Sequence, residues 1–300
     1  ASLGARGETA TLDENSLPRS DRTPKQFIGG KQVRPDSGYS REIVGAYGEP
    51  IGEVGEGNRK DIRNAVEAAS GAAAKWADAS THGRAQILYY IAENLSARAD
   101  EFAVRIAAAT GREPHDAAAE VEQAIERLFT YAAWADKYDG AIHSTPIRGM
   151  TLAVHEPVGV VGAVCPDDEP LLGFVSLVAP AIALGNTVVA VPSERHPLSA
   201  TDFYSVLETS DVPGGVVNIV TGPRDALAKV LAQHDDVQAV WYFGSREGSA
   251  TVEAASTGNM KRTWVSYGRP RDWRAQGQGQ GGDFLRASTQ VKNIWVPVGE

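Results

Sequence analysis

The chain has 300 residues, of which 42% are hydrophobic, and its formal net charge is −9 at pH 7. This length holds one large domain or two small ones, and the acidic balance opposes non-specific binding to nucleic-acid phosphates. No run approaches the ~20 apolar residues that a membrane span requires, and no signal-peptide pattern opens the sequence. Cys165 is the single cysteine, which excludes a disulfide framework and a cysteine-rich zinc site. We therefore expect a cytoplasmic protein without a nucleic-acid or membrane partner.

The first 140 residues predict a polar arm and then a largely helical region. Residues 1–25 are rich in Gly, Ser, Thr, Pro and charged residues, a composition typical of a flexible arm or linker. Residues 26–140 form the helical part, which begins with a hairpin-like turn signal at residues 29–31. Apolar residues spaced by three and four predict helices over 59–76, 82–110 and 116–138. The aromatic residues of the last helix, Trp134 included, are expected in the core.

A ribbon and then an alternation of strands and helices follow. Residues 141–145 and 150–156 flank a Pro-Ile-Arg-Gly turn. From residue 157 to residue 268, apolar strands alternate with helices, and the strands are predicted at 158–164, 187–191, 216–220, 237–243 and 262–266. Continuous β-branched strands separated by helices are typical of a parallel sheet covered on both faces. Ligands of such a Rossmann-type α/β core bind at the carboxyl ends of the strands.

The last part of the chain departs from this alternation. Residues 269–283 form a polar, Gly/Gln-rich tract. We expect a flexible or partly disordered loop there. Residues 284–300 predict a short helix or turn and then a strand.

Several motifs, met in chain order, resemble the aldehyde dehydrogenase superfamily. They are FIGGK at 27–31, EPVGV at 156–160, GNTVV at 185–189, PSE at 192–194, VPGGVVNIVTG at 212–222, FGS at 243–245 and VKNIWV at 291–296. Together they span nearly everything after residue 26. The resemblance implies an α/β fold with a Rossmann-type parallel sheet, N-terminal helices, and an oligomerisation flap built from residues 141–156 and 284–300.

Two positions depart from the family pattern where the chemistry should lie. In that family the loop after the first Rossmann strand reads Pro-Trp-Asn-Phe-Pro, and its asparagine helps to form the oxyanion hole. Asp168 stands in that place here. Losing one oxyanion donor costs roughly 2.7–4 kcal/mol in the transition state, and an ionised aspartate adds repulsion. The family's general-base glutamate falls on Ser266, and a neutral serine has no basicity near pH 7.

The family's catalytic domain, with its nucleophilic cysteine, has no counterpart at the expected place. Only the tract at residues 269–283 separates Gly268 from the last strand, so the resemblance implies that the catalytic domain is missing. Cys165 aligns with the end of a sheet strand, and we expect a buried, inert thiol. We therefore predict no catalytic residue, with Asp168 and Ser266 as degenerate positions.

Half of the family's cofactor site is kept. Glu194 aligns with the glutamate that binds the adenosine ribose. Ser245, preceded by Gly244, aligns with the serine that contacts the pyrophosphate at a helix N-terminus. The lysine that should also hold the ribose is replaced by Val191. We expect no cofactor, with NAD binding weak at most. In the alternative interpretation Glu194 is a solvated helix-entry residue and Ser245 is a simple N-cap.

A run of three carboxylates, Asp167, Asp168 and Glu169, could bind a divalent cation weakly, or it could be a solvated acidic turn. The six histidines show no metal-binding spacing. We expect no metal site.

The resemblance extends to the degenerate, non-catalytic C-terminal domain of two-domain family-16 aldehyde dehydrogenases. It implies a pseudoenzyme module of a larger NAD-dependent aldehyde dehydrogenase that supplies oligomerisation and active-site-covering contacts. The expected partners are a catalytic aldehyde dehydrogenase domain, in cis or in trans, and a second copy of the chain. Two copies would pair as a dimer through residues 141–155 and 291–298. The alternative is a residual NAD-binding or NAD-sensing module.

Overall fold

A seven-stranded sheet forms the centre of the computed structural model, which describes residues 24–146 and 148–297. Its parallel part has the order β11-β10-β7-β8-β9. These strands are β7 (Val160–Val164), β8 (Thr187–Val191), β9 (Val217–Ile219), β10 (Ala239–Tyr242) and β11 (Arg262–Val265). Strands β7 to β10 are buried along their whole length, because helices cover both faces of the sheet. The predicted parallel α/β fold is confirmed.

Two short N-terminal strands extend this sheet in the antiparallel sense. Strand β1 (Gln26–Ile28) pairs with β9 on one side and with β2 (Lys31–Val33) on the other. The turn between β1 and β2 uses two glycines with φ of 66° and 79°, as the hairpin signal predicts. A separate hairpin of β3 (Ser40–Val44) and β4 (Pro50–Gly55), which the sequence analysis missed, follows. The arm predicted at residues 1–25 lies almost entirely outside the described residues.

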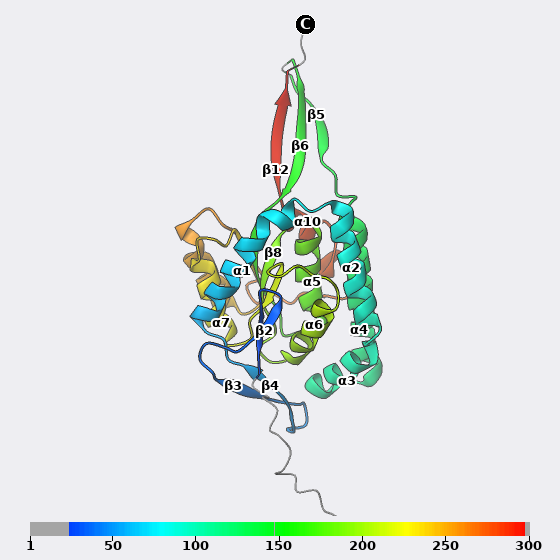
Figure 1. Cartoon of the computed structure of the whole chain (residues 1–300), viewed down its shortest axis with the longest axis vertical. Coiled ribbons are helices and arrows are strands. Elements are labelled where there is room, and N and C mark those ends of the chain that lie inside the picture. The colour runs from blue at the N-terminus through cyan, green and yellow to red at the C-terminus, as the bar shows by residue number, and fades with distance from the viewer. Residues whose placement is uncertain (1–23, 147, 298–300) are drawn as a thin grey trace, which may run out of the picture.

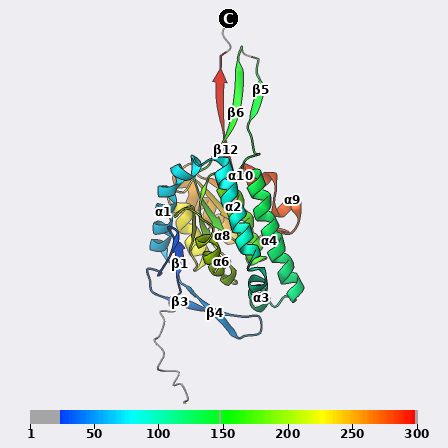
Figure 2. The ribbon, with the colours of Figure 1, turned by 45° about the vertical axis from the view of Figure 1, so that its right-hand side comes forward.

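Helices cover the sheet on both faces (Figures 1 and 2). One face packs chiefly against α2 (Thr81–Ser96), α3 (Ala99–Thr110), α4 (Pro114–Trp134), α5 (Pro170–Ala183), α6 (Leu198–Glu208) and α10 (Gly282–Ser288). The other face packs against α1 (Arg59–Ala77), α7 (Arg224–Gln233) and α8 (Arg246–Ala255). None of the helices within the described ranges is both long enough and apolar enough to cross a bilayer.

Two details of the helical region differ from the prediction. The run expected at 82–110 is two helices, because the backbone at Arg98 leaves helical geometry with φ −117° and ψ 16°. Trp134 was expected in the core, but 39% of its surface is exposed. It is the last residue of α4, and its ring meets Tyr138 edge-on at 6.4 Å near the base of the flap. Tyr131, one turn earlier, is buried as predicted.

A three-stranded antiparallel sheet, the flap, projects from one end of the molecule (Figure 1). It consists of β5 (Ala141–Ser144), β6 (Met150–Pro157) and β12 (Thr289–Val296), with β6 in the middle. The pairing register places Ile294 opposite Leu152, and Leu152 opposite Ile142. Since paired residues point to the same side of a sheet, these three side chains share one face. The predicted ribbon and last strand are thus one structural unit.

Residues 269–288, the return segment, lead from the end of the parallel sheet back to β12. Most of the tract predicted as a loop is irregular, with the short helix α9 (Gln276–Gly279) inside it, and α10 follows, but its side chains pack closely against the rest of the molecule. Trp273 is only 2% exposed and Phe284 is fully buried. The backbone carbonyl of Trp273 accepts a hydrogen bond of 2.8 Å from the buried guanidinium of Arg127 on α4. Tertiary packing therefore orders a segment whose composition favours flexibility.

Candidate functional site

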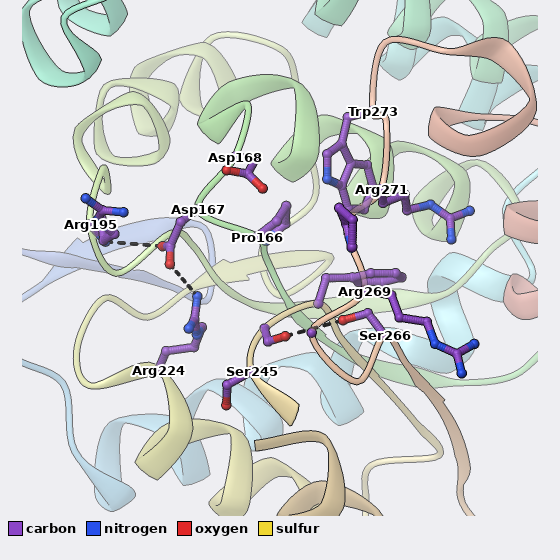
Figure 3. Close-up of a pocket in the computed structure, with 14 residues that line it drawn as sticks. Pro166, Asp167, Asp168, Arg195, Arg224, Ser245, Ser266, Arg269, Arg271 and Trp273 are labelled. Atoms are coloured by element: carbon purple, nitrogen blue, oxygen red, sulfur yellow. Dashed lines mark hydrogen bonds and ion pairs between the residues drawn. The ribbon is translucent and has the colours of Figure 1, made fainter. Parts of the chain in front are cut away.

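A cavity of about 400 Å³ opens beyond the carboxyl ends of β7, β10 and β11. Its lining comes from the loop after β7, the loop between β10 and α8, and the start of the return segment (Figure 3). Four sequence-predicted positions, Asp168, Ser266, Ser245 and Gly244, line this cavity together. The fifth, Glu194, is not among the lining residues. This is the edge of a parallel sheet at which ligands bind.

Asp167 is held by an ion pair across the cavity mouth. Its carboxylate accepts hydrogen bonds from Ser193 Oγ at 2.8 Å and from the backbone N–H of Arg195 at 3.3 Å, and pairs with Arg224 at 2.7 Å (Figure 3). Burial alone would raise the pKa of Asp167. The Arg224 guanidinium and the hydrogen bonds outweigh burial and lower that pKa instead. The Asp167 carboxylate is therefore charged at neutral pH.

Asp168 and Ser266 contribute to the same cavity. Asp168 is exposed, and the Ser266 hydroxyl lies 3.4 Å from the carbonyl oxygen of Gly244. Asp168 therefore brings an acidic side chain to the cavity, and Ser266 brings a hydroxyl that does not accept protons at neutral pH. The lining residues include no cysteine, histidine, lysine or glutamate. The carboxylates of this lining are Asp167 and Asp168, and its hydroxyls are Ser245 and Ser266.

Ser245 is the N-cap of α8. Its hydroxyl accepts a hydrogen bond from the backbone N–H of Gly248 at 2.9 Å. The Tyr242 hydroxyl packs under this turn, and a Cβ at Gly248 would lie 1.8 Å from it, so only glycine fits there. The N-cap interpretation of Ser245 agrees with this geometry. The helix start also gives the cavity a partial positive charge.

Glu194 is engaged within the protein. Its Oε2 accepts a hydrogen bond of 2.9 Å from the backbone N–H of Arg224, the first residue of α7. Its carbonyl oxygen accepts another from Arg41 at 3.0 Å. One carboxylate oxygen is thus already used to hold a helix N-terminus, which reduces what remains for a ribose hydroxyl.

Glu169 turns away from its two acidic neighbours. It pairs with Arg112 at 2.8 Å and with Arg274 of the return segment at 2.9 Å. Asp167 pairs with Arg224 instead, so the three consecutive carboxylates do not converge on one point. No cluster of three or more potential metal-ligating side chains occurs in residues 24–146 and 148–297.

Glu120 on α4, which the sequence analysis missed, completes this network. Its Oε1 accepts hydrogen bonds from the backbone N–H groups of Leu171 and Leu172 at 2.8 and 3.0 Å, and its Oε2 pairs with Arg112 at 2.8 Å. The side chain is fully buried. The carboxylate on α4 therefore accepts hydrogen bonds from the N-terminal amides of α5, next to the loop that lines the cavity. The signal in the sequence was an acidic residue lying in the apolar stripe of its helix.

The Glu120 carboxyl makes stability depend on pH. Burial, followed by the charge of Glu169, raises the pKa of Glu120 to about 7. A carboxyl whose pKa is higher in the folded state stabilises the fold at low pH and loses that contribution as pH rises. We expect the free energy of unfolding of the native chain to fall by roughly 2–3 kcal/mol relative to that of Glu120→Gln between about pH 4.5 and 7.5. Urea unfolding of both proteins across this range measures it; a constant difference would contradict the prediction.

Cys165 lies at the end of β7 and is fully buried. Burial raises the pKa of its thiol far above the ordinary value, so the reactive thiolate is suppressed. The predicted buried thiol is confirmed.

A doubly covered parallel sheet with a cavity at its carboxyl edge defines a Rossmann-type α/β protein. The aldehyde dehydrogenase family model matches residues 34–269, and the chain belongs to this family. It is 33% identical over 246 residues to the betaine aldehyde dehydrogenase of Bacillus subtilis, covering 81% of this chain and 50% of that protein. It is 35% identical over 268 residues to the retinaldehyde dehydrogenase 3 of Rattus norvegicus, covering 84% and 52%. The chain thus spans about half the length of these relatives.

Solved structures agree with this assignment. A putative aldehyde dehydrogenase from Burkholderia cenocepacia superposes with a TM-score of 0.78 at 28% identity, over 81% of this chain and 50% of that one. The betaine aldehyde dehydrogenase of Staphylococcus aureus in complex with NAD+ gives 0.77 at 26% identity, over 82% and 50%. The fold described above is therefore that of one half of an aldehyde dehydrogenase.

Proposed function

We propose that this chain is a non-catalytic aldehyde dehydrogenase module that supplies oligomerisation contacts and helps to cover the active site of a catalytic domain, in cis or in trans. One observation carries the proposal. Asp168 and Ser266, which take the places of the family's oxyanion asparagine and general base, line one cavity that contains no cysteine, histidine or lysine. The cavity lining therefore offers no thiol nucleophile, and neither of the two substituted positions carries the group that the family uses there.

The position of the flap supports the second half of the proposal. Strand β6 ends at Pro157, just before β7 begins, and Pro157 is paired with Thr289 at the start of β12. The flap therefore leaves from the amino ends of the parallel strands, whereas the cavity lies at their carboxyl ends. Since the flap projects from one end of the molecule (Figure 1) and the cavity lies at the other ends of the parallel strands, any active site that the flap covers belongs to another domain or chain.

An assay of NADH formation tests the catalytic part of this proposal. The purified chain is incubated with NAD+ and betaine aldehyde, with the Bacillus subtilis relative as the positive control. We expect no turnover, and none from the double variant Asp168→Asn/Ser266→Glu, because restoring two groups does not restore a nucleophile. Turnover by the native chain that is lost on heat unfolding would overturn the proposal.

Residual dinucleotide binding is the second candidate, and the cavity lining favours it. The start of α8 is capped by Ser245, and two exposed arginines, Arg195 and Arg269, line the same cavity. Helix N-termini and arginines bind phosphates. Calorimetric titration with NAD+ decides between the two functions. Saturable heat that weakens in Arg269→Ala supports the binding module, and absence of heat at millimolar NAD+ removes it.

A further inference from the structure

Four aromatic rings surround the guanidinium of Arg271. Its central carbon lies 5.5 Å from the ring centre of Phe243, 5.1 Å from Trp264, 5.6 Å from Trp273 and 5.2 Å from Phe284. We call these four aromatic residues the cage. Each distance is within the range in which a cation is attracted to the face of an aromatic ring. Such enclosure by four rings is the arrangement by which proteins recognise organic cations.

The cage does not depend on Arg271 for its shape. Trp264 meets Phe243 edge-on at 5.1 Å and Phe284 edge-on at 5.1 Å, and Trp273 meets Phe243 edge-on at 5.1 Å. Edge-to-face contacts of this kind are favourable by themselves. Three of the rings are at most 5% exposed. Contacts among the rings therefore support the arrangement of the cage independently of Arg271.

The rings are the main partners of this cation. Within the part of the chain that the structure describes, no carboxylate forms an ion pair with Arg271. Its Nε donates a hydrogen bond to the carbonyl oxygen of Gln278. Burial lowers the pKa of Arg271, but a guanidinium stays protonated at neutral pH. The π-faces of the cage are therefore close electrostatic partners of this charge, and the carboxylate of Asp283 also acts on it without forming an ion pair.

The cage joins segments that are far apart in the chain. Phe243 follows β10, Trp264 lies in β11, Trp273 lies in the return segment, and Phe284 lies in α10. The contacts of the Arg271 guanidinium with the cage therefore attach the return segment to the edge of the parallel sheet, just before the chain enters the flap.

We propose that the cage is a guanidinium-binding site in which Arg271 is a tethered ligand, and that a free alkylguanidinium binds there when this side chain is removed. The ligand class follows from the geometry: the four rings already contact a flat guanidinium, and this group loses less hydration on binding than an ammonium does. Phe243, Arg271 and Trp273 also line the cavity at the carboxyl edge of the sheet, so this site adjoins the proposed cofactor cavity but includes no residue of the flap.

Chemical rescue tests the proposal. We expect Arg271→Ala to lower the thermal midpoint by about 4 °C or more. Methylguanidinium at about 10 mM should restore at least half of that loss, a concentration too low to denature the protein. Urea at the same concentration, which is flat but neutral, should restore nothing. The matched control is Arg286→Ala, whose exposed side chain pairs with Asp283 and should show no rescue.

Equal effects of methylguanidinium and urea, or none from either, would overturn the proposal. If Arg271→Ala does not fold, Arg271→Met provides the second test, because it refills the space without the charge. Trypsin cleavage after Arg274 then reports the docking of the return segment. We expect cleavage at least about 10-fold faster in Arg271→Met than in the native chain. An unchanged rate would mean that the charge of Arg271 does not bind the cage.

Discussion

Replacing Glu120 by alanine is expected to destabilise the protein by about 3–5 kcal/mol, because it removes one partner from a buried charge network. The backbone N–H groups of Leu171 and Leu172 would lose their acceptor. Arg112 would lose the more deeply buried of its two carboxylate partners and keep only Glu169. Each of these groups would then be left with an incomplete set of partners in a poorly solvated place. For a chain of this size, such a loss is a large part of the whole stability.

Urea unfolding at pH 7.5, followed by circular dichroism, measures this loss. The control is Glu120→Gln, whose amide oxygen can still accept the two backbone hydrogen bonds, so a smaller loss is expected. The surface variant Glu101→Ala removes an exposed pair with Arg98 and should cost at most about 1 kcal/mol. If the alanine variant were as stable as the native chain, the network would not support α5.

Placing a charge on the apolar face of the flap should abolish self-association. One face of the flap carries six apolar side chains, Ile142, Met150, Leu152, Val154, Ile294 and Val296, and Ile142 alone is 69% exposed. If this face forms the proposed dimer, Ile294→Glu buries an unpaired carboxylate in the interface. The cost of several kcal/mol corresponds to at least about a 100-fold weaker association.

Sedimentation velocity over a range of concentrations measures the association of the 31.9 kDa chain. Asn293→Glu is the matched control, because the adjacent residue of β12 points to the opposite face of the same strand. We expect the native chain and Asn293→Glu to sediment as dimers and Ile294→Glu as monomers. A monomeric native chain would contradict the proposed homodimer and direct the test to a catalytic domain as the partner.

The parallel sheet could be predicted from the sequence because its determinants are local. Runs such as Thr187–Val191 are apolar and β-branched without interruption, and such a run is stable only where both faces of a strand are covered. The cavity followed from the same reasoning, since the loops after parallel strands meet at one edge. Asp168, Ser266 and Ser245 were therefore brought together as the chain order implies.

The partners of these residues could not be predicted, because they come from distant parts of the chain. Arg112 and Arg274 both reach Glu169, although Arg112 precedes α4 and Arg274 lies in the return segment near the end of the chain. The return segment shows the same limit. Its glycines and glutamines favour a loop, yet two side chains, Arg271 and Trp273, find their positions among rings from other elements. Composition predicts the conformation that a segment prefers in isolation, and tertiary contacts can stabilise a different one.

The placement of the flap and the cavity at opposite ends of the parallel strands makes this half-molecule modular. A substitution at Asp168 or Ser266 shares no neighbour with one at Ile294, so their effects on stability should add. Chemistry can therefore be lost at one end while the architecture of the other end stays intact. The same separation makes the scaffold a candidate for protein engineering, because the cavity can be rebuilt without redesigning the flap.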